Sequence, residues 1–254
     1  MTGPTPSLSV VIPVYNEIGN LERNLRHCVA YLSGQSDRFE ILAVDDFSTD
    51  GSWELLEQLR ESGLPIRTSR HPRNLGKGMA LRNGLGLSSG EWVVLIDADS
   101  ELPIEMLSSF RRIQVSTGAD LVVGSKRHPH SRIHYPLRRR FLSRGYNLIV
   151  RWIFDLPVTD TQVGFKLIRG DLARRLSRSS LVKRFAIDVE FLVQASLLSA
   201  NLVDAPVELK FSRKGSGRVT VRTVLEISRE TAGIWYRRYI SGFYARALCG
   251  YGKI

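Results

Sequence analysis

The strongest constraint on the fold is an alternation of short apolar runs and helical segments along the first hundred residues. Runs rich in Val, Ile and Leu occur at residues 8–13, 39–44 and 91–96. After the first run, apolar residues recur at the spacing of an amphipathic helix over residues 21–32. Because strands that are apolar throughout are buried on both faces, this alternation predicts a mostly parallel sheet covered by helices on both sides. We therefore expect an α/β fold.

The second half of the chain is less regular. Further strands are expected at residues 120–125, 163–168 and 203–211. Residues 137–154 predict a basic, aromatic amphipathic helix, and residues from 221 onward predict an amphipathic helical extension. Ligands of open α/β sheets bind at the carboxyl ends of the strands, which is where the unusual residues of this chain gather.

Length and composition fit one two-part domain. A chain of 254 residues with 43% hydrophobic content buries a sizeable core. We expect a domain over residues 1–219, with halves at 1–100 and 101–219, and a helical tail over 220–254. No run reaches the ~18 apolar residues of a membrane-spanning helix, and the N-terminus lacks the basic segment of a signal peptide. Two cysteines form no disulfide framework, so we expect a cytosolic protein.

The net charge of +11 favours an anionic partner, such as nucleic acid, anionic lipid or a phosphorylated substrate. The basic residues are unevenly placed, because no Asp or Glu occurs between Lys126 and Phe154. That interval also contains Tyr146 and Trp152. Its cations are Lys126, Arg127, Arg132, Arg138, Arg139, Arg140, Arg144 and Arg151.

Two aspartates directly follow the strand predicted at residues 91–96. Side chains two residues apart on an extended segment share one side, so Asp97 and Asp99 can converge while Ala98 points away. Two close carboxylates repel each other unless a cation lies between them. Oxygen ligands suit Mg²⁺ or Mn²⁺ shared with substrate phosphates, and Glu101 is near enough to be a third ligand. The alternative is that the acids cap the next helix.

A second acidic pair, Asp45 and Asp46, follows the strand predicted at residues 39–44. These carboxylates can accept hydrogen bonds from a nucleobase or ribose, or cap the next helix, a role that Asp50 or Ser52 can also fill. Residues 74–78 (NLGKG) form a glycine-flanked basic loop whose backbone N–H groups can meet phosphate or sugar oxygens. This loop has neither the phosphate-binding Walker spacing nor the dinucleotide-binding spacing.

In their order along the chain, these segments resemble the signature of family 2 glycosyltransferases of the GT-A, Rossmann-like fold. The signature segments are residues 13–17 (PVYNE), 44–51 (VDDFSTDG), 74–78 (NLGKG) and 97–99 (DAD). The second half is similar to the polyprenyl-phosphate branch, which contains the dolichyl-phosphate mannose and glucose synthases. That similarity lies in residues 124–127 (GSKR), 143–147 (SRGYN), 160–166 (DTQVGFK) and 188–190 (DVE). The resemblance covers roughly residues 8–219.

The resemblance implies that residues 1–100 bind a nucleotide-sugar donor. The residues that would hold the base and ribose are Pro13, Tyr15, Glu17 and Asp46, with Asp45 nearby. Lys77 would also belong to the donor site. Asp97 and Asp99 would hold Mg²⁺ or Mn²⁺ on the donor diphosphate, with Glu101 in place of a common glutamine.

The same resemblance implies that residues 101–219 bind the acceptor, a polyprenyl phosphate. Arg127, Arg139 and Ser143 would receive its phosphate. The basic stretch of Arg213, Lys214 and Arg218 matches a loop that closes over the site. Val163 replaces a commoner cysteine in the segment 160–166, which is a mild departure from the pattern.

The implied reaction is an inverting displacement that moves a hexose from a donor of the GDP-mannose or UDP-glucose type. The segment 185–190 (FAIDVE) is more similar to the glucose-type relatives. A phosphate acceptor is already ionised and needs placement by guanidinium groups, which gives Arg127 a catalytic role. A soluble hydroxyl or amine acceptor, the alternative, needs a carboxylate base, and Asp188 or Glu190 is the candidate. Both acids can equally serve as negative charge at a helix N-terminus.

Two further expectations concern partners. A nucleic-acid-binding module is the third hypothesis, but the acids at the strand ends would repel a phosphate backbone. The helix at 137–154 and the aromatic tail predict peripheral attachment to the cytoplasmic face of a membrane, because Arg beside Trp and Tyr suits the headgroup region. The alternative is packing against the domain with the Arg side chains extending outward.

Overall fold

The computed structural model describes residues 6–35, 38–99, 101–133, 137–209 and 221–249, with only the backbone for 137–144, 221, 222 and 224. The strands are β1 (Leu8–Val14), β2 (Phe39–Asp45), β3 (Ile66–Arg70), β4 (Trp92–Leu95), β5 (Leu121–Ser125), β6 (Arg132–Ile133), β7 (Lys166–Arg169), β8 (Leu202–Pro206) and β9 (Glu208–Leu209). The helices are α1 (Leu21–Ser33), α2 (Ser52–Glu61), α3 (Lys77–Leu87), α4 (Met106–Thr117), α5 (Leu137–Phe154), α6 (Gly170–Ser179), α7 (Ile187–Leu197), α8 (Val221–Trp235), η1 (Tyr236–Ile240) and α9 (Phe243–Cys249).

The main sheet of the described chain has seven strands in the order β3-β2-β1-β4-β7-β5-β8. Neighbouring strands pair in parallel everywhere except at β7, which is antiparallel to both β4 and β5. The predicted α/β fold with a mostly parallel sheet is confirmed. The carboxyl ends of β1, β2 and β4 meet at one edge of the sheet, as parallel strands require.

The reversed strand β7 brings a distant segment to that edge. Lys166, its first residue, pairs with Leu95, the last residue of β4. Because β7 runs the other way, the chain just before it lies beside the chain just after β4. Residues 160–166 therefore approach Asp97, although more than sixty residues separate them in sequence.

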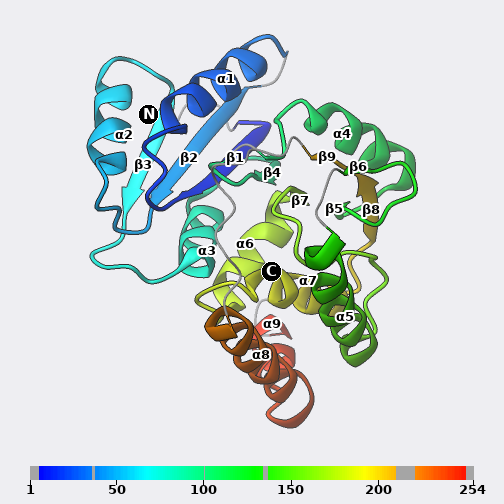
Figure 1. Ribbon diagram of the computed structural model, residues 1–254. Helices are drawn as coiled ribbons and strands as arrows, with labels where there is room; N and C mark the ends of the chain where they lie inside the picture. Colours follow the sequence, from blue (N-terminus) through cyan, green and yellow to red (C-terminus); the bar gives the residue numbers. More distant parts are fainter. Residues whose placement is uncertain (1–5, 36–37, 100, 134–136, 210–220, 250–254) are drawn as a thin grey trace.

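Helices cover both faces of the sheet, and each face has its own apolar core. Helices α1, α2 and α4 pack on one face through residues such as Leu21, Leu56 and Phe110, while α3, α6 and α7 pack on the other (Figure 1). Helix α1 is amphipathic in the predicted way, with Leu21, Leu25, Cys28 and Leu32 buried. Each such fully buried side chain stabilises the fold by roughly 1.5–3 kcal/mol.

The last predicted strand differs from the structure, which divides it between two sheets. Strand β8 pairs with β5 as far as Pro206, and β9 pairs with β6. A proline has no N–H to extend the ladder. The next residue, Val207, donates its N–H to the Ser131 hydroxyl at 2.9 Å.

The C-terminal helices pack into the second core, so the predicted helical extension is present. Ile234, Tyr244 and Leu248 are buried there. The Tyr239 hydroxyl donates to the Ile153 carbonyl at 2.9 Å and its ring stacks on Phe154, which places η1 against the end of α5. Within the described residues, none of the helices combines the length and the hydrophobicity that crossing a bilayer requires.

Candidate active site

A cavity of about 430 Å³ opens at the carboxyl ends of β1, β2 and β4. Five segments that are far apart in sequence border it. Its lining residues are Pro13, Val14, Tyr15, Glu17, Asp46, Asn74, Gly76, Lys77, Ala80, Asp97, Ala98, Asp99, Arg184 and Phe185. Of the predicted donor-site residues, only Asp45 is not in this lining.

Asp97 and Asp99 reach the cavity from a turn. Strand β4 ends at Leu95, so strand pleating does not place the two carboxylates as the sequence analysis assumed. The turn is held instead by Asn24, whose side-chain amide donates to the Ala98 carbonyl at 2.7 Å. Ala98 itself is buried. Asp97, Ala98 and Asp99 therefore all border the same cavity.

Gly164 packs directly against Asp97. A Cβ atom at this position would lie 2.1 Å from the Asp97 Oδ2 atom, so only glycine leaves room for the carboxylate. This close approach is the result of the reversed β7. It gives the glycine of the segment 160–166 a steric role beside the acidic pair.

Lys77 neutralises Asp97. Its Nζ atom lies 2.6 Å from Asp97 Oδ1. Burial acts to raise the pKa of Asp97, but Lys77, followed by Lys166 and Lys126, outweighs it and holds that pKa below its usual range. Burial conversely acts to lower the pKa of Lys77, and Asp97, Asp188 and Asp99 together raise it above its usual range. Both groups are therefore charged at neutral pH.

Asp99 and Glu17 carry negative charge that the surrounding protein leaves poorly compensated. Burial and the nearby Asp97 raise the pKa of Asp99. Burial, Asp99, Asp50 and Asp97 raise the pKa of Glu17. A hard divalent cation binds carboxylate oxygens and relieves repulsion of this kind between them. The residues present therefore fit Mg²⁺ or Mn²⁺.

The predicted third ligand, Glu101, follows Asp99 closely in sequence and is not among the residues that line the cavity. Its backbone N–H donates to the Asp99 carboxylate at 3.0 Å. No group of three His, Cys, Asp or Glu side chains is arranged to hold a metal within the described residues. Asp97 and Asp99 both line the cavity, where Glu17 and Asp46 add two further carboxylates.

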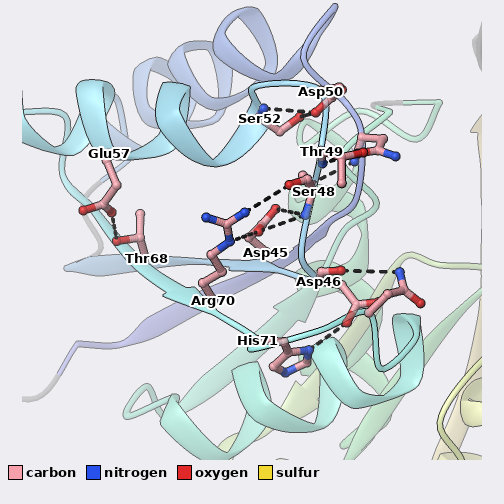
Figure 2. A network of polar contacts seen from close by, with 12 residues as sticks. Asp45, Asp46, Ser48, Thr49, Asp50, Ser52, Glu57, Thr68, Arg70 and His71 are labelled. Carbon is pink, nitrogen blue, oxygen red and sulfur yellow. Dashed lines mark hydrogen bonds and ion pairs between the residues drawn. The ribbon is translucent and has the colours of Figure 1, made fainter.

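Asp46 organises the loop that precedes α3. Its carboxylate accepts hydrogen bonds from the backbone N–H groups of Leu75 and Gly76, at 2.8 and 2.7 Å. The His71 ring nitrogen Nδ1 lies 2.8 Å from the same carboxylate, as Figure 2 shows. Asp46 thus borders the cavity while fixing the glycine loop that carries Lys77.

Asp45 points the other way and is fully enclosed. It lies 3.2 Å from the Arg70 guanidinium and accepts hydrogen bonds from the Ser48 N–H (Figure 2). Arg70 also lies over the rings of Phe47 and Trp53, at 5.3 and 5.2 Å from their centroids. The structure therefore places Asp45 behind the cavity wall, where it holds the loop after β2.

The loops after β1 and β2 are joined to each other. Asn16 receives the Thr49 N–H on its side-chain oxygen at 2.8 Å, and its own N–H donates to the Ser48 hydroxyl. The Glu17 N–H donates to the Ser52 hydroxyl. Asp50 accepts hydrogen bonds from both the N–H and the hydroxyl of Ser52, the first residue of α2, whose N-cap position is Gly51. These contacts present Tyr15, 48% exposed, at the rim of the cavity.

The predicted acceptor residues lie mostly outside what the structure describes. Arg127 is half-buried, with its guanidinium 3.5 Å from Asp160 and 3.3 Å from the Thr159 carbonyl. Arg213 and Lys214 lie outside the described residues, and so do the side chains of Arg139 and Ser143 on α5. Arg127 is not part of the cavity lining.

Asp188 and Glu190 lie at the start of α7 and do not line the cavity. Asp188 forms an ion pair with the fully buried Lys166. Glu190 accepts the backbone N–H groups of Leu181 and Val182 and the Tyr244 hydroxyl. Both carboxylates are thus engaged within the protein.

Two groups of residues that the sequence analysis did not assign to the donor site contribute to it. Arg184 and Phe185 line the cavity from the loop before α7. Lys126 and Lys166 act electrostatically on Asp97. The acid-free basic interval pointed to Lys126, whereas nothing in the local sequence links residues 184 and 185 to strand ends about a hundred residues earlier.

A comparison with protein families identifies the family of this chain. Residues 9–176 match the sequence model of the family described as glycosyl transferase family 2. The chain belongs to this family. The match covers the strands β1, β2 and β4, the glycine loop and both acidic pairs, so this glycosyltransferase has its family signature at the edge of the sheet described above.

Curated relatives are similar over most of this glycosyltransferase chain. A dolichyl-phosphate beta-glucosyltransferase of Trichomonas vaginalis is 28% identical over 245 residues, 89% of this chain and 72% of the relative. A second one from that organism is 30% identical over 210 residues, 79% of this chain and 65% of the relative. A dolichyl-phosphate beta-glucosyltransferase of Dictyostelium discoideum is 28% identical, with 79% and 65% coverage. The chain thus spans just under two thirds of the length of two of these relatives.

Solved structures share the fold. Glucosyl-3-phosphoglycerate synthase from Mycobacterium tuberculosis in complex with UDP has a TM-score of 0.65, at 20% identity, over 92% of this chain and 80% of that one. The same enzyme with Mn²⁺, UDP and glucosyl-3-phosphoglycerate has a TM-score of 0.65 at 21% identity, with the same coverage. The GT-A fold expected from the sequence is confirmed.

Proposed function

We propose that this glycosyltransferase moves glucose from a nucleotide sugar to a polyprenyl phosphate, with Mg²⁺ or Mn²⁺ as cofactor. The observation that carries the proposal is the cavity in which Asp97 and Asp99 face Lys77 at the strand ends. The curated relatives named above are dolichyl-phosphate beta-glucosyltransferases, which supports glucose as the sugar and a lipid phosphate as the acceptor.

The donor would lie along the strand ends. Tyr15 and Glu17 offer a ring and a carboxylate at the rim, where a nucleobase and ribose need stacking and hydrogen bonds. Asp46 presets the glycine loop, from which Lys77 would face the diphosphate. Asp45 would not contact the donor; its ion pair with Arg70 holds the loop after β2 in place.

Asp97 and Asp99 would hold the divalent cation, and Lys77, which lies beside Asp97, would meet a phosphate oxygen of the donor. When bound, the cation supplies positive charge that stabilises the departing nucleoside diphosphate. Lys77 adds a second positive charge at the same place. Solved GT-A neighbours carry Mn²⁺ or Mg²⁺ together with UDP, which supports this choice of metal.

The engaged state of Asp188 and Glu190 favours a phosphate acceptor over a neutral hydroxyl. A hydroxyl acceptor needs a free carboxylate base within hydrogen-bond reach. Asp188 forms an ion pair with Lys166. The Glu190 carboxylate accepts hydrogen bonds from two backbone N–H groups and a tyrosine hydroxyl. An ionised phosphate needs only placement, which Arg127, with Arg139, Ser143, Arg213 and Lys214, would provide.

A lipid acceptor requires contact with a membrane, and we place this contact on the exposed side of α5 and η1, at the cytoplasmic face. Leu148, Ile149 and Trp152 are exposed on α5, with Trp152 84% exposed. Tyr236, Tyr239 and Ile240 are exposed on η1, which the Tyr239 contact holds against α5. Aromatic side chains interleaved with Arg237 and Arg238 suit the headgroup region.

The test is transfer of label from radiolabelled UDP-glucose, GDP-mannose and UDP-GlcNAc into an organic-extractable product. Each reaction contains the protein, Mn²⁺ or Mg²⁺ and a polyprenyl phosphate, with EDTA and Asp99→Ala as controls. We expect label in the organic phase from UDP-glucose, and none in either control. Turnover of UDP-glucose onto a water-soluble acceptor, with an unlabelled organic phase, would contradict the lipid-phosphate proposal and favour the soluble-acceptor alternative.

A further inference from the structure

The loop of residues 181–186, here called the wall loop, joins α6 to α7 and forms one wall of the cavity. Arg184 and Phe185 line the cavity from it. The wall loop has no regular secondary structure of its own through residue 183, so its backbone N–H groups need partners from elsewhere. Their partners are carboxylates of the two helices behind the loop.

Glu190 and Glu230 hold the wall loop from behind. Glu190 of α7 holds the first half of the wall loop, because its carboxylate accepts the N–H groups of Leu181 and Val182. The second half is held by Glu230 of α8. Its Oε1 atom accepts the Arg184 N–H and its Oε2 atom accepts the Ala186 N–H, both at 3.0 Å. One carboxylate therefore brackets Phe185, and its charge lies at the N-terminus of α7, where it is favoured.

On its other side, the wall loop contacts the glycine loop of residues 74–78 and the start of α3. The Met79 N–H is shared: it donates to the Gly76 carbonyl at 2.9 Å and to the Lys183 carbonyl of the wall loop at 3.2 Å. A Cβ atom on Gly76 would lie 2.4 Å from that carbonyl oxygen, and one on Gly78 would lie 2.7 Å from the Val182 carbonyl oxygen. The two backbones are thus in direct contact beside Lys77, with no side chain between them.

We propose that Glu230 is a positioning residue of the cavity: from the C-terminal helix α8, it fixes the wall loop so that Arg184 and Phe185 face the nucleotide-sugar site and the Lys183 carbonyl stays docked on the glycine loop. The mechanism needs no contact between Glu230 and substrate. It makes α8 a working part of the donor site, although α8 lies outside the family match at residues 9–176. The nucleotide part of this inference rests on the proposed function, whereas the docking of the loop does not.

The first measurement is hydrogen–deuterium exchange at the peptides that contain Arg184, Ala186 and Met79. The variant is Glu230→Gln, which keeps the shape of the side chain but turns one acceptor into a donor that faces an N–H group. The control is Glu22→Gln, which removes a carboxylate from an exposed ion pair with Arg26 on α1. We expect exchange at all three amides to rise by about tenfold in Glu230→Gln, as for loss of one charged hydrogen bond, and to stay unchanged in the control.

The second measurement is the affinity for UDP and for GDP in the presence of Mn²⁺, followed by KM and kcat for the sugar donor. In Glu230→Gln we expect nucleotide affinity to fall by roughly fivefold and KM to rise equally, with kcat within about twofold of wild type, as for loss of uniform binding. Glu230→Asp, which keeps the charge on a shorter side chain, should recover part of the affinity. It also replaces Glu230→Gln if that variant does not fold.

Unchanged exchange at Arg184 and Ala186 in Glu230→Gln would overturn the proposal. Raised exchange there with unchanged exchange at Met79 and unchanged nucleotide affinity would overturn the link between Glu230 and the cavity. If wild-type protein binds neither nucleotide, the proposed function fails, and exchange at Met79 alone then decides whether Glu230 keeps the wall loop docked.

Discussion

At the scale of single residues, Asp99 and Asp50 differ sharply in what their charge does to the folded protein. Burial and Asp97 raise the pKa of Asp99, so its negative charge opposes folding when no ligand is bound. Asp50 is the opposite case. Although burial acts against it, hydrogen bonds from Ser52 and Ile18 hold the pKa of Asp50 below its usual range, so its charge stabilises the fold.

Asp99→Asn should therefore separate stability from activity. We expect the melting temperature of the metal-free protein to rise, because the substitution removes a repelled charge and keeps an oxygen for the Glu101 N–H. Turnover should fall by roughly 100-fold or more, the scale seen when one electrostatic contact to a developing charge is lost. Differential scanning fluorimetry and the transfer assay measure the two effects. Asp50→Asn is the matched control and should lower the melting temperature; a fall in Asp99→Asn would contradict the account.

Glu190 gives a prediction for pH dependence. Burial raises its pKa, in spite of the hydrogen bonds from Tyr244, Val182 and Leu181. A carboxyl group with a raised pKa binds its proton more tightly in the folded state, so its favourable contribution is present below the unfolded pKa of about 4.3 and is lost as pH rises through the folded pKa. The free energy of unfolding of Glu190→Gln should therefore gain on that of wild type as pH rises from about 4 to 7. Denaturant unfolding at several pH values measures both free energies. If the free energy of unfolding of Glu190→Gln instead fell relative to that of wild type between about pH 4 and 7, the raised pKa of Glu190 would be refuted.

At the scale of elements, the sequence predicts the positions of the strands better than their directions. The apolar runs locate β1, β2, β4 and β5, because buried strands need an apolar residue at nearly every position. The reversal of β7 and the division at Pro206 follow from contacts with other strands, which a local pattern does not contain.

The tight contact between α3 and the wall loop predicts opposite effects for the same substitution in two helices. Gly78→Ala, on α3, would place its Cβ atom 2.7 Å from the Val182 carbonyl oxygen and should destabilise the fold by about 1–3 kcal/mol. Gly145→Ala, on α5, meets no atom within 4 Å and should stabilise the fold by about 0.5–1 kcal/mol, through helix propensity alone. Thermal or denaturant unfolding compares them. Equal effects at both positions would rule out the contact.

At the scale of the whole molecule, the cavity lies where the sheet brings the local signature segments together. The signature segments after β1, β2 and β4 meet because parallel strands share one edge. The sequence could not show that Asp45 turns to Arg70 while Asp46 turns to the cavity, since adjacent acids have the same local pattern. It also could not place Arg184, which reaches the cavity through contacts between residues about a hundred positions apart.

The exposed apolar residues of α5 and η1 give a prediction for the molecule as a whole. Wild-type protein should co-sediment with vesicles that contain anionic phospholipid, and Trp152→Ala should weaken this binding by roughly tenfold, since an interfacial Trp contributes on the order of 1–2 kcal/mol. Val115, 77% exposed on α4, is the control, and Val115→Ala should leave binding unchanged. Equal binding by the two variants would place the membrane contact elsewhere.

The proposed function requires that Asp97 and Asp99 hold a divalent cation against a nucleoside diphosphate in the cavity at the strand ends. Calorimetric titration of UDP and GDP into the protein, with Mn²⁺ and then with EDTA, tests it most directly. We expect wild-type protein to bind one of the two nucleotides in Mn²⁺ and to bind it at least tenfold more weakly in EDTA. Asp99→Asn should bind that nucleotide as weakly as wild type in EDTA, whether Mn²⁺ or EDTA is present. Equal affinity in Mn²⁺ and EDTA for wild-type protein, or full Mn²⁺-dependent affinity in Asp99→Asn, would contradict it.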